Sequence, residues 1–158
     1  MTEIWIPGDP PTVTQQQHRV IYVHGKPRFV PTSRLRKTRK HFADILSQYD
    51  GETYTEPVTA TITWIFPYRS SEKKSIISAG RLIPKYTRPD VDNLNKALLD
   101  EMTGSGIIQD DAIIAELITR KCWGPAPGIL IMIDDLNTTG FERDITAGIE
   151  SVTKCGSL

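Results

Sequence analysis

The densest group of chemically useful side chains lies between residues 88 and 111 of this 158-residue chain. It runs Arg88-Pro89-Asp90-Val91-Asp92-Asn93-Leu94-Asn95-Lys96, and Asp100 and Asp110-Asp111 follow. Residues two apart in an extended segment face the same way, so Asp90 and Asp92 are expected to aim two carboxylates at one point. Two such carboxylates repel each other unless they face water or a cation, and Mg²⁺ prefers oxygen ligands of this kind. The pattern therefore predicts a divalent-metal site just before a helix.

A lysine is expected beside these carboxylates. If a helix begins at Asp92 or Asn93, Lys96 lies four residues after Asp92, on the same face and about 5–6 Å away. Hydrolysis of a phosphodiester uses a metal to activate water and a cation to stabilise charge on the reacting phosphoryl group. The residue types and their spacing therefore indicate phosphodiester hydrolysis by water, without a covalent protein intermediate.

A purely structural interpretation of the same string stays open. Asp92 fits a helix cap, Lys96 its partner one turn later, and Asp90 a turn former after proline. A calcium loop starting at Asp90 is excluded, because Leu94 and Asn95 stand where an oxygen ligand and a glycine are required. The chain also lacks a phosphate-binding loop, a serine nucleophile elbow and an H-E-x-x-H pair. The three histidines, His18, His24 and His41, fit phosphate contacts or surface positions.

The elements that must position this group follow from periodicity and turn residues. Strands are predicted at 2–6, 58–66, 112–123 and 129–133, with a hairpin of 19–23 against 28–30. Helices are predicted from Thr32 or Ser33 to about Tyr49, and from Asp92 or Asn93 to about Met102, the second with an apolar stripe of Leu94, Leu98 and Met102. This order predicts one α+β domain over residues 1–133, with a mixed sheet and two main helices. Residues 68–89 are expected to form a mobile basic loop, and residues 134–158 a polar tail or short helix.

Charge is distributed unevenly along the chain, although the formal net charge is zero. Residues 1–88 hold 14 Lys and Arg against 7 Asp and Glu, whereas residues 89–158 hold 5 against 12. A basic half that grips phosphates and an acidic half that holds cations would suit a nuclease, although chance also produces such asymmetry. No membrane span or signal peptide is recognisable, which predicts a cytoplasmic protein, and Cys122 and Cys155 are expected to be reduced and incidental.

The segment from Pro89 to Asp111 resembles the RusA family of Holliday-junction resolvases, which are common in phages and prophages. The match follows a P-D-x-D-N-L-x-K…D…G…D-D pattern that includes Asp100, Gly106 and Asp110-Asp111. A Pro-Pro turn, the basic hairpin at residues 25–28, the Pro31-Thr32 turn and a basic helix extend the resemblance over roughly residues 4–133. The polar loop Thr12–Gln17 and the tail after Ile133 depart from the family pattern.

The resemblance implies that Asp90, Asp92 and Asp111 bind Mg²⁺, with Mn²⁺ as a substitute, and that Lys96 assists catalysis. Asp100 and Asp110 match acidic positions, and Asp100 either orients Lys96 or forms a salt bridge. The family resemblance further implies a homodimer that makes paired nicks in a four-way DNA junction, inside the bacterial host cell.

Basic residues spread over the first 88 positions are the candidate DNA contacts. They are Arg19, Lys26, Arg28, Arg36, Lys37, Lys40, Lys73, Lys74, Lys85 and Arg88. Those of the basic helix cannot all share one face, so a soluble helix surface is an alternative for some of them. The resulting hypothesis is a Mg²⁺-dependent, structure-selective DNA endonuclease. A general nuclease of branched or flap DNA and a non-catalytic DNA-binding phage protein remain alternatives.

Overall fold

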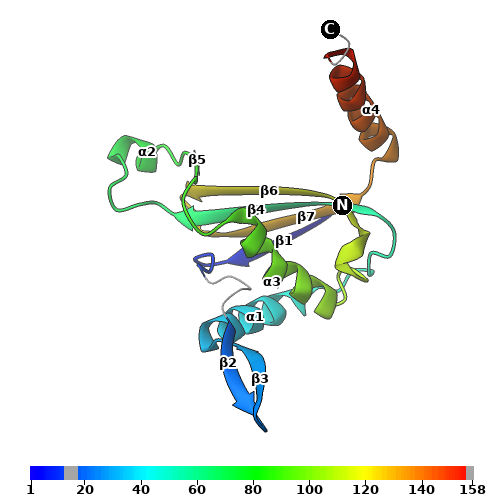
Figure 1. The fold of residues 1–158 in the computed structure, drawn as a ribbon. Helices are drawn as coiled ribbons and strands as arrows, with labels where there is room; N and C mark the ends of the chain where they lie inside the picture. The colour runs from blue at the N-terminus through cyan, green and yellow to red at the C-terminus, as the bar shows by residue number, and fades with distance from the viewer. Residues whose placement is uncertain (13–17, 156–158) are drawn as a thin grey trace.

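A five-stranded mixed sheet and a separate two-stranded hairpin form the framework of the protein (Figure 1). The structure is a computed structural model that describes residues 1–12 and 18–155. In chain order the elements are β1 (Thr2–Pro7), β2 (His18–Val23), β3 (Lys26–Pro31), α1 (Ser33–Leu46), β4 (Val58–Pro67), α2 (Lys74–Ser78), β5 (Ile83–Pro84), α3 (Val91–Gly104), the 3₁₀ turn η1 (Asp111–Ile113), β6 (Ile114–Gly124), β7 (Gly128–Asp135) and α4 (Thr138–Cys155). The predicted α+β fold with a mixed sheet is confirmed.

The central strand of the sheet is β4, and the strand order is β1-β7-β4-β6-β5. β4 pairs in parallel with β6 and antiparallel with β7, which makes the sheet mixed. Its side chains alternate, with Val58, Ala60, Ile62, Trp64 and Phe66 buried. This alternation, together with β-branched and aromatic residues, is what a half-covered central strand requires.

Helices α1 and α3 cover one face of the sheet (Figure 1). The predicted stripe of Leu94, Leu98 and Met102 is buried in the core. α1 begins where the sequence predicted, because the Thr32 side chain accepts a hydrogen bond from the Leu35 amide at 3.3 Å. The apolar face of each helix was therefore readable from the 3.6-residue period.

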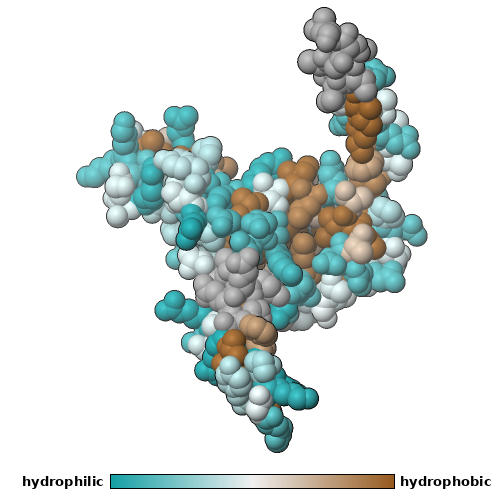
Figure 2. All heavy atoms as spheres, in the orientation of Figure 1, coloured by the Kyte–Doolittle hydropathy of each residue, from teal (hydrophilic) through white to brown (hydrophobic). Residues whose placement is uncertain are grey.

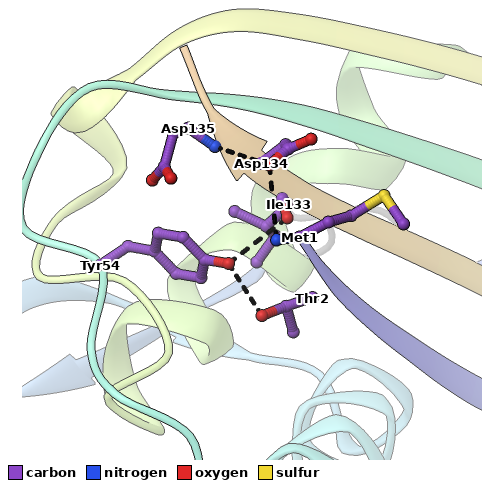
Figure 3. Close-up of polar contacts among 6 residues, drawn as sticks. All are labelled: Met1, Thr2, Tyr54, Ile133, Asp134 and Asp135. Atoms are coloured by element: carbon purple, nitrogen blue, oxygen red, sulfur yellow. Dashed lines mark hydrogen bonds and ion pairs between the residues drawn. The ribbon is translucent and has the colours of Figure 1, made fainter.

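The predicted hairpin forms as β2 and β3, joined by His24 and Gly25. Both turn residues have positive φ, 50° and 75°, as a two-residue turn of this handedness demands. The far end of the main sheet is tied differently. Tyr54, in the segment before β4, places its hydroxyl 2.8 Å from Thr2 Oγ1 and donates to the Ile133 carbonyl at 3.4 Å (Figure 3). These contacts join the start of β1 and the end of β7 to the connection that follows α1.

The less regular segments differ from what the sequence predicted. Residues 68–89 contain α2 and β5, and β5 pairs with the end of β6 through Ile83 and Pro84. Periodicity missed β5 because its pairing partner lies about 40 residues further along the chain. Residues 138–155 form a helix, as one of the two alternatives predicted, but it is the longest of the described helices and not a short one; this helix, α4, projects away from the sheet on the side opposite α1 and α3 (Figure 1). Within the described part of the chain, no helix has the length and apolar character needed to span a membrane.

Candidate active site

Asp90 and Asp92 both lie at the N-terminus of α3. Asp90 occupies the cap position with extended backbone angles, φ −74° and ψ 148°, and α3 begins at Val91. The sequence predicted the cap at Asp92 or Asn93, two to three residues later than the observed cap. The expectation that Asp90 and Asp92 share one face of an extended segment was also wrong, because Asp92 already belongs to the first helical turn.

The cap position does not use the Asp90 carboxylate. Its side chain makes no capping hydrogen bond, although its carbonyl accepts one from the Leu94 amide at 3.2 Å. Both aspartates are exposed, and neither is ion-paired to another described residue. The unsatisfied amides and the positive end of the helix dipole favour negative charge here. The carboxylate oxygens of Asp90 and Asp92 are therefore stabilised by the helix and remain free to bind a cation.

Lys121, in β6, fixes the backbone that leads into Asp90. Its ammonium donates to the carbonyl of Thr87 at 2.8 Å and to that of Pro89 at 2.6 Å. One step earlier, the Lys85 amide donates to the Lys121 carbonyl at 2.9 Å, which continues the ladder between β5 and β6. The sequence interpretation assigned no role to Lys121. The one feature that could have indicated a role is the presence of a lysine within a partly buried strand.

Asn95 fixes the rotation of α3 about its own axis. It is only 4% exposed, accepts a hydrogen bond from Trp64 Nε1 at 3.0 Å and donates one to Thr119 Oγ1 at 2.6 Å. These contacts tie the helix to both β4 and β6. A buried polar side chain with both of its groups satisfied admits few other orientations of the helix. Sequence reasoning named Asn95 within the motif but assigned it no role.

Lys96 is exposed on α3, one turn after Asp92, as predicted. No ion pair joins Lys96 to Asp92 among the described residues, so its ammonium is free to meet a phosphate. Asp100 takes the salt-bridge alternative, since Arg39 of α1 donates to it at 2.8 Å. Arg39 Nε also lies 2.9 Å from a Glu101 carboxylate oxygen. Arg39 therefore joins α1 to α3 through two acidic residues.

Asp111 lies at the opposite end of α3. The 14 residues of α3 separate Asp90 from the connection to η1, a length of about 20 Å at 1.5 Å per residue. The strand gives a similar result, because Lys121 holds the Pro89 carbonyl at one end of β6. The turn η1, which begins at Asp111, leads directly into Ile114 at the other end, about 23 Å from Lys121 along β6 at 3.3 Å per residue. Figure 1 shows α3 and β6 running in opposite directions between these two ends. One chain therefore brings Asp90 and Asp92 together but leaves Asp111 apart.

Asp110 and Asp111 have different surroundings at that second end. Asp110 caps η1, because its side chain accepts from the Ala112 amide at 2.8 Å. Asp111 is exposed, and its side chain makes no hydrogen bond or ion pair within the described part of the chain. Among the described side chains, no group of three or more His, Cys, Asp or Glu is arranged to hold a metal ion. The three carboxylates of one chain thus do not fit a single ion.

Most of the predicted DNA contacts are exposed cations. Arg19, Lys26 and Arg28 lie on the hairpin, Arg36, Lys37 and Lys40 on α1, and Lys73, Lys74 and Arg88 around α2 and before α3. Lys85 differs, because its ammonium lies 4.9 Å from the centre of the Phe66 ring and 4.8 Å from that of Trp123. Burial lowers the pKa of Lys85, and the nearby charges of Lys121 and Arg69 lower it further. Its surroundings therefore resemble a packing contact more than a free phosphate ligand.

The sequence matches a known protein family. The family described as RusA, endodeoxyribonuclease, matches residues 7–134, well over half of the chain. This range contains α3, η1, β6 and every aspartate discussed above. No curated protein matches the sequence.

Proposed function

The chain belongs to the RusA family of endodeoxyribonucleases and is a Holliday junction resolving endonuclease, and we propose that it cuts DNA by metal-dependent hydrolysis at the N-terminus of α3. The proposed catalytic residues are Asp90, Asp92, Lys96 and Asp111. The observation that carries the proposal is that Asp90 and Asp92, neither of them in an ion pair with a described residue, lie at the N-terminus of α3. Lys121 holds the backbone just before Asp90. Water is the proposed nucleophile.

Asp90 and Asp92 supply hard oxygen ligands of the kind that Mg²⁺ takes, and Mn²⁺ would be accepted by the same donors. When bound, such an ion lowers the pKa of water and polarises a phosphoryl oxygen. The contribution of the chain itself is to hold these ligands rigidly, because Lys121 and Asn95 fix the start of α3 against the sheet. A rigid arrangement of charge costs no reorganisation during the reaction.

Lys96 is proposed to stabilise negative charge on the phosphate that is cut. It lies one turn beyond Asp92, is exposed, and has no competing ion pair with Asp92. The exposed cations of the hairpin and of α1 are proposed to bind the phosphates of branched DNA, because such contacts position a duplex without reading its sequence. The proposed place of action is the cytoplasm of a bacterial host, where this DNA is found.

The direct test is cleavage of a synthetic, mobile four-way junction with Mg²⁺, using EDTA as the control. Asp92→Asn should lower the cleavage rate by at least ~100-fold while junction binding persists, because the substitution removes a negative ligand and not a DNA contact. Asp144→Asn changes an exposed aspartate of α4 in the same way and should cut normally. A fully active Asp92→Asn enzyme would refute the assignment.

The role of Lys96 has a separate readout. Lys96→Ala should slow single-turnover cleavage of the bound junction by more than it weakens junction binding, because its charge is assigned to the reacting phosphate. Flap and linear duplex substrates, tested beside the junction, measure how far the enzyme prefers branched DNA. An unchanged single-turnover rate in Lys96→Ala would remove this residue from the site.

A further inference from the structure

The β2–β3 hairpin projects from the rest of the protein. Within the described part of the chain its two strands pair only with each other, so the hairpin is separate from the main sheet. Figure 1 shows it extending beyond α1, away from that sheet. β3 ends at Pro31 and α1 begins at Ser33, so a single residue joins hairpin and helix. The hairpin is therefore held at its base by α1, and most of its length is open to a ligand.

One face of the hairpin carries exposed rings. The register sets Val20 opposite Phe29 and Tyr22 opposite Pro27, and alternate residues of a strand point to the same side, so these four residues share a face. We call it the aromatic face. Val20 is 48% exposed, Tyr22 74% and Phe29 73%. The cross-strand pair of Val20 and Phe29 stabilises the hairpin, yet most of each ring stays accessible.

The other face of the hairpin carries its cations. The same alternation places Arg19, Lys26 and Arg28 together on this side, and all three are exposed. We call it the cationic face. No acidic residue occurs between Asp9 and Asp44, a stretch that includes the hairpin and most of α1. The hairpin therefore joins an aromatic face to a cationic face, with no carboxylate of its own to neutralise the charge.

This combination of side chains suits a nucleic acid in which bases are accessible. Proteins bind unstacked bases by laying aromatic rings on them while nearby cations hold the phosphates. The interior of a duplex exposes only the edges of its bases, whereas the helical stack is interrupted where the arms of a junction meet. The last base pair of an arm then has a free flat face. The charge of the hairpin favours DNA as its ligand, and its rings favour the branch point.

We propose that the aromatic face of the hairpin stacks on bases at the branch point of the junction, through Tyr22 and Phe29. The cationic face holds phosphates of the adjoining arm. This inference rests on the proposed function only in that the hairpin contacts DNA, and it uses no property of the metal site. Stacking stabilises a complex only where the DNA offers a free base face, so these two rings determine the preference for branched over linear DNA.

Binding to two DNA forms tests the proposal. Fluorescence anisotropy in EDTA, which keeps the DNA intact, gives the Kd for a four-way junction and for a linear duplex. Tyr22→Thr and Phe29→Thr remove a ring but keep a residue suited to a strand. Each should weaken junction binding about 10-fold and duplex binding by less than about 2-fold. Tyr22→Phe keeps the ring and should bind as the wild type does. Equal losses for junction and duplex would overturn the proposal.

Two control variants separate stacking from charge and from a general loss of apolar surface. Arg28→Ala should weaken junction and duplex binding alike and reduce the slope of log K against log salt by about 1. The ring variants should leave this slope unchanged, and a reduced slope in Tyr22→Thr would contradict stacking. Ile145→Thr removes a half-exposed apolar side chain from α4, the other projecting element, and should bind junctions normally.

Photochemical cross-linking locates the contact. Junctions carry 5-iodouracil either at the branch point or in the middle of one arm, and the complexes are irradiated in EDTA. Mass spectrometry should find the adduct on Tyr22 or Phe29 when the label is at the branch point, and not when it is within the arm. No adduct on either ring, or equal adducts from both positions, would overturn the proposal.

A protein ligand for the aromatic face has a different signature. If a second copy of the chain covered this face, Tyr22→Thr would change the molecular mass seen by light scattering in the absence of DNA, and this result would overturn the proposal. An unchanged mass is expected. None of these measurements needs a metal or a cut, so their failure would leave the proposed function standing. An active Asp92→Asn enzyme would refute that function and leave the hairpin contacts unaffected.

Discussion

Helices α3 and α4 have similar apolar patterns but different surroundings. Leu98, within the stripe of α3, is completely buried between the sheet and α1. Ile145 and Ile149, spaced by one turn on α4, are 48% and 59% exposed. Figure 2 shows this apolar stripe on the projecting helix. The period of the apolar residues therefore predicts that a helix has a face, but not whether the fold supplies anything to cover it.

Polar contacts account for much of this difference. α3 is attached through Asn95, through the Arg39 pair with Asp100, and through the Lys121 contacts before its first turn. α4 begins with a local cap, where Asn137 Oδ1 accepts from the Gly140 amide at 3.0 Å. A local cap stabilises a helix without fixing its direction, whereas contacts to distant strands stabilise the helix and also fix its direction. The catalytic carboxylates are proposed for the helix that is fixed.

The largest change in the free energy of unfolding is expected from a substitution on the buried face of α3. Leu98→Ala should lower the free energy of unfolding by about 2–5 kcal/mol, because it removes a fully buried side chain and leaves a cavity. Urea denaturation followed by circular dichroism measures the change. A loss below about 1 kcal/mol would show that α3 is less firmly packed than the comparison with α4 requires.

A smaller change in the free energy of unfolding is expected when the buried side-chain amide of Asn95 is removed. Asn95→Ala leaves the Trp64 indole N–H without its acceptor, which should cost about 1–3 kcal/mol in unfolding free energy. Asn93→Ala, a more exposed position on the same helix, is the matched control and should cost less. Equal losses in the two variants would mean that Asn95 does not fix the helix to the sheet.

The smallest effect is expected on α4. Ile145→Ser should change the unfolding free energy of one chain by no more than about 0.5 kcal/mol, because the side chain is already half exposed. The measurement uses the same urea transition, at a protein concentration low enough to dissociate any dimer. A loss comparable to that of Leu98→Ala would mean that α4 folds back onto the body of the protein, and the two helices would no longer differ.

The sequence predicted the sheet strands and the two packed helices because each has a local period, two residues for β4 and 3.6 for α1 and α3. For residues 134–158 it predicted a polar tail or short helix and so missed the length of α4, although Asn137 and the one-turn spacing of Phe141, Ile145 and Ile149 were visible signals. It missed β5 for a different reason. A two-residue strand has no period of its own and exists only where the edge of β6 pairs with it.

The sequence alone supplied the candidate reactive groups, because the aspartates and the lysine stand in the segment from Asp90 to Asp111 that resembles the RusA family. The tertiary structure decided where these groups stand. It placed Asp92 inside α3, paired Asp100 with Arg39 in a salt bridge, and separated Asp111 from Asp90 by the length of α3. These outcomes depend on contacts between residues far apart in the chain, since strand order and helix direction set them, and no local pattern encodes either one.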